Sequence, residues 1–214
     1  MIKEFHINID DTQIDLLNKK IELTRWPDEI NNKYWSHGTS MSFLKDLSKY
    51  WINDFNWRTH EQALNDIGSY KFSSQSGLDI HFLHAKSNQK NSLPLVMTHG
   101  WPGSIQEFIK VIPLIQEQSD RPIDIICPSL PGFGFSDKPK DLGMNSEQMA
   151  KIQHELIMAL GYKQYIVQGG DWGATVSKWM AELFPENCIG IHLNLVIAFP
   201  SNTKNSMKGV TDKE

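Results

Sequence analysis

The chain has 214 residues, which is long enough to bury a sizeable single core. Its 40% hydrophobic and 21% charged residues are typical of a globular protein, which excludes a disordered tail, a coiled coil and a collagen-like repeat. The net charge is -4 and no basic tract is present, so nucleic acid is not expected as a partner.

Two further exclusions concern targeting and redox state. No apolar run approaches the ~18 residues needed to span a bilayer, and the N-terminus lacks a basic-then-apolar leader, so no membrane anchor is expected. Cys127 and Cys188 form no CxxC motif. We expect them to be reduced core residues of a cytoplasmic protein.

The first part of the chain, residues 1–68, is predicted to be helical and holds four of the seven tryptophans. A helix is expected to be capped by Asp11. It is expected to end at Arg25-Trp26-Pro27, because the residue before proline is disfavoured in the α region. Residues 34–65 are predicted to form short helices and aromatic loops. Their tryptophans are expected to pack against a neighbouring surface.

From residue 69 the pattern changes to an alternation of strands and helices. One helix is predicted to begin at Ser104 and to continue through Ile115, a second begins at Asn145 or Ser146, and a third ends before Pro185. Such alternation predicts an α/β fold with a mostly parallel sheet and helices on both faces. Residues 201–214 are predicted to be a loop or a cut end. The predicted strands span residues 69–74, 78–85, 93–98, 123–128, 165–169 and 189–197.

The run Gly169-Gly170-Asp171-Trp172-Gly173 joins a predicted strand to a helix almost at once. Small residues two positions before and after Asp171 are the spacing of a nucleophile elbow, a strained turn that raises one side chain above the sheet. An aspartate stands where serine is usual. The alternative is therefore that Asp171 only caps the helix that follows.

A second loop, His99-Gly100-Trp101-Pro102-Gly103-Ser104, also follows a strand and precedes a helix. In an elbow-type hydrolase this loop gives one backbone N–H to the oxyanion hole, and the residue after the nucleophile gives the other. Those donors would be the amides of Trp101 and Trp172. His99 is expected to be a buried histidine that shapes the loop. The other residues expected to shape the two turns are Gly100, Pro102, Gly169, Gly170 and Gly173.

These two motifs together resemble the α/β-hydrolase-fold epoxide hydrolases, and most of all their microsomal-type branch. The resemblance implies an incomplete α/β-hydrolase fold preceded by a helical, Trp-rich segment. It divides the chain into an N-terminal wrapping segment, 1–68, and the N-terminal half of the hydrolase core, 69–214, ending near the cap insertion point. Other matching runs are Arg25-Trp26-Pro27, Tyr34-Trp35, Trp57-Arg58, Ile80-His81-Phe82, Pro131-Gly132-Phe133-Gly134-Phe135-Ser136 and Ile191-His192-Leu193-Asn194.

An aspartate at the elbow suits epoxide chemistry. A carboxylate with an ordinary pKa of about 3.9 is ionised at neutral pH and can attack without a base. Attack on an epoxide carbon leaves an alkyl ester on Asp171, and water can then attack the ester carbonyl to release a diol. The resemblance thus implies a detoxifying hydrolase that takes a small apolar epoxide and water, with no cofactor and no metal.

The resemblance also implies a histidine–acid pair and cap tyrosines beyond the last predicted strand. None of the eight histidines follows that strand, and all five tyrosines precede Asp171. We therefore expect the N-terminal portion of an epoxide hydrolase, or a truncated gene product, that is alkylated but does not turn over. Its last strand would then be an exposed apolar edge that promotes oligomers.

Two other functions stay open. Haloalkane dehalogenases also place tryptophan after an aspartate elbow, but they usually carry asparagine at the position of Trp101. A non-catalytic relative that binds a small ligand or partner is the other alternative, and it is also consistent with the absent base. The sequence has no Gly-x-Ser-x-Gly, no second histidine after His154-Glu155 and no dinucleotide or P-loop motif, which argues against a serine esterase, a zinc protease and a nucleotide-binding enzyme.

Overall fold

The computed structural model describes residues 1–30 and 35–197, so that Tyr34 and the predicted loop at residues 201–214 lie outside the described residues. The chain divides into two compact units. One is His6–Asp66, and the other combines Met1–Phe5 with the chain from Ile67 onward. The second unit contains the sheet and the candidate site.

The unit His6–Asp66 is helical, as predicted. Its helices are α1 (Asp11–Glu22), α2 (Met41–Asn53) and α3 (Trp57–Ile67). The cap of α1 is Asp10, one residue before the expected Asp11, because the Asp10 carboxylate accepts the backbone N–H of the second helical residue at 2.8 Å. No residue of α1 or α2 is buried. The packing of this unit's tryptophans against a neighbouring surface stays a prediction.

A buried carboxylate, Glu61, ties this helical unit together. It accepts the backbone N–H of Ile9 at 2.7 Å, the indole N–H of Trp57 at 3.0 Å and the guanidinium of Arg58 at 2.7 Å. Arg58 also pairs with Asp11. Burial alone would raise the pKa of Glu61, but these hydrogen bonds outweigh it and lower that pKa. Glu61 therefore stays charged and links α3 to the chain before α1.

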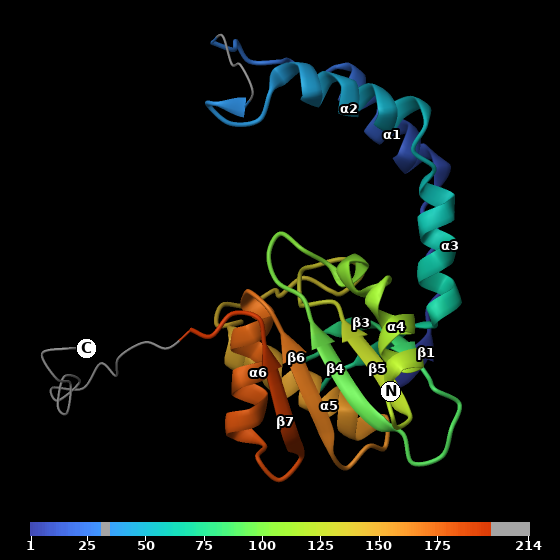
Figure 1. Ribbon diagram of the computed structural model, residues 1–214, viewed down its shortest axis with the longest axis vertical. Coiled ribbons are helices and arrows are strands. Elements are labelled where there is room, and N and C mark those ends of the chain that lie inside the picture. The colour runs from blue at the N-terminus through green and yellow to red at the C-terminus, as the bar shows by residue number, and fades with distance from the viewer. Residues whose placement is uncertain (31–34, 198–214) are drawn as a thin grey trace, which may run out of the picture. The chain divides into compact units, whose positions relative to one another are not determined.

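The second unit is built on one seven-stranded sheet with the order β1-β2-β3-β5-β4-β6-β7 (Figure 1). Strands β4, β5, β6 and β7 pair in parallel, while β1, β2, β3 and β5 pair antiparallel. The mixed α/β fold predicted from the sequence is confirmed. The strands are β1 (Ile2–Glu4), β2 (Ser69–Ser73), β3 (Asp79–Ala85), β4 (Leu93–Thr98), β5 (Ile123–Pro128), β6 (Tyr165–Gly169) and β7 (Cys188–Leu193).

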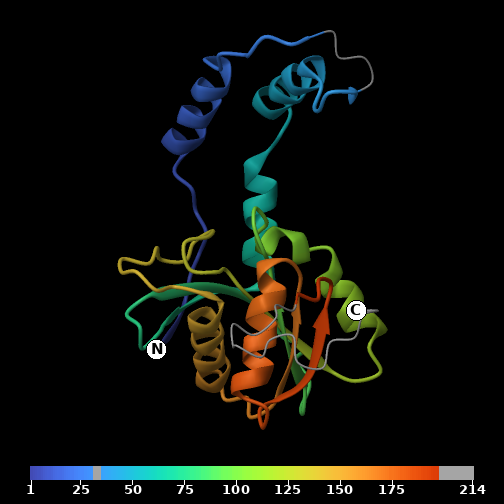
Figure 2. The same cartoon turned by 90° about the vertical axis from the view of Figure 1, so that its left-hand side faces the viewer.

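Helices cover both faces of the sheet. Helices α5 (Ser146–Ala159) and α6 (Trp172–Leu183) lie on one face, and α4 (Val111–Gln118) lies on the other (Figure 2). The prediction of one continuous helix from Ser104 is wrong, because a short 3-10 helix, η2 (Ile105–Phe108), is followed by a separate α4. Pro113 explains the break, because proline fits only in the first turn of a helix and would disrupt the interior of one that began at Ser104.

Alternating side chains of the parallel strands divide between a closed core and the opposite face. Val96, Ile126 and Val167 are fully buried in the cluster that includes Leu156 of α5 and Met180 of α6. Each such side chain stabilises the fold by about 1.5–3 kcal/mol. Leu95 and Met97, on either side of Val96, and Gln168, next to Val167, line instead the pocket described below. The core thus fixes the strands whose carboxyl ends carry the candidate site.

The last strand is shorter than predicted. β7 ends at Leu193, four residues before the expected end, because the chain bends at Asn194, whose N–H donates to the carbonyl of Gly169 at 3.0 Å. β7 stands last in the strand order, and Ile189 and Ile191 are about half exposed. Oligomerisation through this strand stays a prediction. Within the described ranges, no helix is long and apolar enough to span a bilayer.

Candidate active site

The turn between β6 and α6 presents one side chain in a strained conformation. Only two residues separate the end of β6 at Gly169 from the start of α6 at Trp172. Asp171 has φ 51° and ψ −129°, a region that residues with a side chain rarely adopt. Its carboxylate makes no capping hydrogen bond to α6, so the alternative that Asp171 only caps this helix is wrong.

Two glycines make this turn possible by close backbone approach. A Cβ on Gly173 would lie 1.9 Å from the carbonyl oxygen of Thr98, and a Cβ on Gly169 would lie 2.1 Å from the carbonyl oxygen of Gly173. The start of α6 therefore rests directly on the ends of β4 and β6. At Gly170 a Cβ would meet nothing nearer than Asn194 at 3.4 Å, so space alone does not require glycine there.

The loop after β4 is held by a buried histidine. His99 is 1% exposed, and its Nε2 lies 3.1 Å from the backbone N of Leu130, which can only donate. Nδ1 therefore carries the proton and donates to the carbonyl of Gly100 at 3.0 Å. Burial lowers the pKa of His99, which keeps the ring neutral. His99 is thus buried, as expected from the sequence, and its ring links the carbonyl of Gly100 to the N–H of Leu130. The following Trp101–Pro102 peptide bond is cis.

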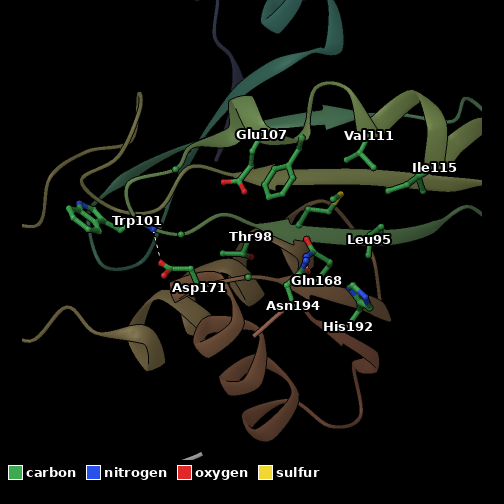
Figure 3. A pocket seen from close by; sticks show the side chains of 15 residues that line it. Leu95, Thr98, Trp101, Glu107, Val111, Ile115, Gln168, Asp171, His192 and Asn194 are labelled. Carbon is green, nitrogen blue, oxygen red and sulfur yellow. Dashed lines mark hydrogen bonds between the residues drawn. The ribbon is translucent and has the colours of Figure 1, made fainter. Parts of the chain in front are cut away.

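The two turns meet at the carboxylate of Asp171. The backbone N–H of Trp101 donates to its Oδ1 at 2.8 Å (Figure 3). Gly100 leaves the necessary room, because a Cβ there would lie 2.3 Å from the same oxygen. The amide of Trp101, and then that of Trp172, lower the pKa of Asp171. The side chain is therefore a carboxylate at neutral pH, with the Trp101 amide hydrogen-bonded to it.

A pocket of about 620 Å³ opens beside this carboxylate. One end of the pocket is lined by Asp171, Trp101, Thr98 and Glu107 (Figure 3), and the polar side chains of Gln168, His192 and Asn194 lie further along it. The remainder is mostly apolar, and such a wall removes an apolar ligand from water while the carboxylate faces it. The apolar side chains that line it are Leu95 and Met97 of β4, Phe108 of η2, and Val111 and Ile115 of α4.

Five polar pocket residues were not predicted as site residues: Thr98, Glu107, Gln168, His192 and Asn194. Gln168 donates through Nε2 to Oδ1 of Asn194 at 2.8 Å, which joins β6 to the end of β7. His192 pairs with Gln168 across the sheet and lies at the end of the pocket away from Asp171 (Figure 3). The sequence signals for these residues were a strand pattern and a helix-capping spacing, neither of which indicates which face lines a pocket.

The donor set does not favour a metal. In the part of the chain that the structure describes, no three His, Cys, Asp or Glu side chains lie close enough to hold a metal ion together. Cys127 is buried and free, and Cys188 is half-buried and free.

Two protein-family models match this chain. Residues 94–206 match the family model described as alpha/beta hydrolase fold, and both turns lie within that range. Residues 2–108 match the model described as epoxide hydrolase N terminus. The two models together span nearly the whole chain. This chain belongs to the epoxide hydrolase family.

Individual relatives agree with this assignment. The chain is 42% identical to a putative epoxide hydrolase of Stigmatella aurantiaca, covering 93% of this chain and 46% of the relative. It is 38% identical to epoxide hydrolase 1 of Oryctolagus cuniculus, covering 92% and 45%. The structure of juvenile hormone epoxide hydrolase from Bombyx mori superposes with a TM-score of 0.84 at 37% identity, covering 91% and 53%. The chain thus spans about half the length of the curated relatives it matches.

Proposed function

We propose that this chain carries the nucleophile and the oxyanion donors of an epoxide hydrolase. The proposal rests on the geometry of Asp171. Its backbone has φ 51°, its Oδ1 lies 2.8 Å from the amide nitrogen of Trp101, and its carboxylate lies beside a mostly apolar pocket. Membership of the epoxide hydrolase family supports the same reaction. The substrate class is a small apolar epoxide, because the lining offers dispersion contacts and one anionic nucleophile.

The first step forms an ester. Oδ1 is held by the Trp101 amide, so we assign Oδ2 of Asp171 as the oxygen that attacks an epoxide carbon. The C–O bond of the ring breaks, and the ring oxygen takes a proton from solvent to become a hydroxyl group. No base is needed, because the two amides keep the pKa of Asp171 low and the carboxylate ionised.

The second step hydrolyses the ester. Water adds to the carbonyl carbon of the Asp171 ester, and the negative charge develops on Oδ1, where the amides of Trp101 and Trp172 would stabilise it. One such donor typically lowers the barrier by about 3 kcal/mol. Within the 214 residues no histidine follows His192, so we propose that the ester on this chain forms much faster than it is hydrolysed.

Intact-mass spectrometry tests this proposal. Incubation of the 214-residue chain with excess styrene oxide is expected to add one reagent mass per chain, and hydroxylamine is expected to remove it, as it removes an ester. Fast multiple-turnover diol production would contradict the stalled ester. Binding without any covalent addition would favour a ligand-binding relative. Addition from a bromoalkane with bromide release, but none from the epoxide, would favour a dehalogenase.

A further inference from the structure

A buried hydrogen bond ties the end of β4 to helix α5, and the proposed function leaves it without a role. The hydroxyl of Thr98 donates to Oε1 of Gln153 at 2.9 Å, and the two residues are 55 positions apart in the chain. Both side chains are buried. The bond therefore joins two distant elements inside the core, directly behind the turns of the candidate site.

Glutamine at this position of α5 is costly for the fold. Its amide nitrogen, Nε2, has no hydrogen-bond partner among the residues that the structure describes. A buried polar atom without a partner destabilises a fold, whereas an apolar side chain of the same shape does not. Leu156 and Ile157 of the same helix are apolar and fully buried. Stability of the fold therefore does not account for Gln153.

Thr98 is the residue at which the two turns of the candidate site meet. A Cβ on Gly173 would lie 1.9 Å from its carbonyl oxygen, so the start of α6 rests on it. The loop that presents the Trp101 amide begins directly after it. In the sheet Thr98 pairs with β6, but the pairing of β4 with β5 extends only to Val96. The last residue of β4 is thus held by one neighbouring strand and by the side-chain bond to α5.

Resting on the proposed function, we infer that Gln153 is a positioning residue that acts through Thr98 on Asp171. By holding the Thr98 hydroxyl, Gln153 restricts rotation of the backbone at the end of β4. The carbonyl of Thr98 then meets Gly173 in one position, which fixes the height at which the turn presents the Asp171 carboxylate. A displacement of about 1 Å at a reacting group can slow a reaction by about 10²-fold, so a small shift suffices.

The competing explanation is that the bond only holds β4 to α5. Two substitutions of similar shape separate the explanations, because T98V replaces the hydroxyl by a methyl group and Q153M removes both polar atoms of the amide. Each alone leaves one partner buried without its hydrogen bond, so each should lower stability. The double variant leaves neither partner and also removes the unpaired Nε2. It should be at least as stable as the unsubstituted chain.

The experiment measures stability and alkylation separately in the full 214-residue chain. Urea unfolding gives the midpoint of unfolding. Intact mass over a series of styrene oxide concentrations gives the maximal alkylation rate, kinact, and the half-saturating concentration, KI. We expect kinact to be about 10-fold lower in T98V, in Q153M and in the double variant, with no further loss in the double variant. KI should stay within about twofold, because the apolar walls of the pocket are unchanged.

Two further variants serve as controls. Ser177 of α6 is fully buried, and its hydroxyl has no partner within the described part of the chain. S177A therefore removes a buried hydroxyl without removing a bond, and its kinact should equal that of the unsubstituted chain. T98S keeps the hydroxyl and should recover most of the kinact that T98V loses.

Each other result decides against a specific claim. A double variant that is alkylated as fast as the unsubstituted chain would overturn the inference. So would a double variant of lower stability, because the bond would then serve the fold, and so would an equal loss of kinact in S177A. A change confined to KI would place Thr98 in substrate binding and would also overturn it. Failure of the unsubstituted chain to form any adduct would instead contradict the proposed function of Asp171, so the two failures are distinguishable.

Discussion

The two turns that meet at the pocket, residues 169–173 and 99–104, follow neighbouring parallel strands but are fixed by different forces. The first is fixed by backbone contact, with Gly173 pressed against the carbonyl of Thr98. The second is fixed by hydrogen bonds from the buried ring of His99. One presents a side chain and the other presents a main-chain N–H. At Asp171 the positive φ accompanies close backbone approach, whereas the Trp101 amide is positioned by the hydrogen bond from His99 to the neighbouring carbonyl of Gly100.

The largest effect is expected from removing the charge that the first turn presents. In D171N the side chain keeps its shape but is a neutral amide, a very poor nucleophile. Alkylation by styrene oxide should therefore fall by at least about 10³-fold, measured by intact mass over time. D120N, at an exposed aspartate, should be alkylated like the unsubstituted chain. Comparable alkylation of D171N would remove Asp171 from the reaction.

The second-largest effect is expected from a substitution at the close contact between Gly173 and Thr98. In G173A the new methyl group would lie 1.9 Å from the Thr98 carbonyl oxygen, so the start of α6 must shift. We expect a loss of about 2–4 kcal/mol in unfolding free energy and about 10²-fold slower alkylation. G170A is the matched control, since its methyl group meets only Asn194 at 3.4 Å. If G173A and G170A have the same unfolding free energy in urea and the same alkylation rate, the turn is not fixed by steric contact.

A smaller effect is expected from the hydrogen bonds of the second turn. H99L leaves the N–H of Leu130 and the carbonyl of Gly100 without partners, at about 1–3 kcal/mol for each buried group. The Trp101 amide should then move, which would slow alkylation by about 10-fold or more. H154L is the control, because His154 bonds to Tyr165 outside the pocket. It should lower stability without slowing alkylation, and the same slowing in both variants would contradict the aiming role of His99.

The smallest effect on alkylation is expected from pH. Burial lowers the pKa of His81 to about 3 and that of His84 to about 4. Between pH 7.5 and 5 the unfolded chain binds protons at these residues and the folded chain does not. The unfolding free energy should therefore fall by about 2 kcal/mol for each histidine.

Alkylation should not follow that loss of stability. The pKa of Asp171 is lowered, so its carboxylate stays ionised down to pH 5. Its rate constant, measured by intact mass, should stay within about twofold over the same range. A rate that falls with the titration of an ordinary histidine would indicate that a histidine takes part in the first step.

The sequence predicted the strands and both turns well, because each signal was local. The run 93–98 is apolar and its strand is buried, and the spacing of small residues around Asp171 predicted the turn that the structure shows. β1 was missed because Ile2–Glu4 is only three residues long and owes its state to pairing with β2. The break before α4 was missed because the apolar spacing from Phe108 to Ile115 fits one helix, and Pro113 overrides it.

The rest of the site depends on contacts between distant parts of the chain. Glu107 follows Ser104 at a capping spacing, which says nothing of its distance from Asp171, 64 positions further along. Gln168 and Asn194 come together because β6 and β7 pair in register. Local patterns thus predicted the residues that the turns present, and the sheet topology determined which other side chains join them.

The most direct test of the central claim is to find which residue carries the alkyl group. After one equivalent of styrene oxide has reacted, the chain is digested and the labelled peptide is sequenced by tandem mass spectrometry. The account predicts a single label on the carboxylate of Asp171. A label on Glu107, on Cys188 or on a histidine, with Asp171 unmodified, would contradict it.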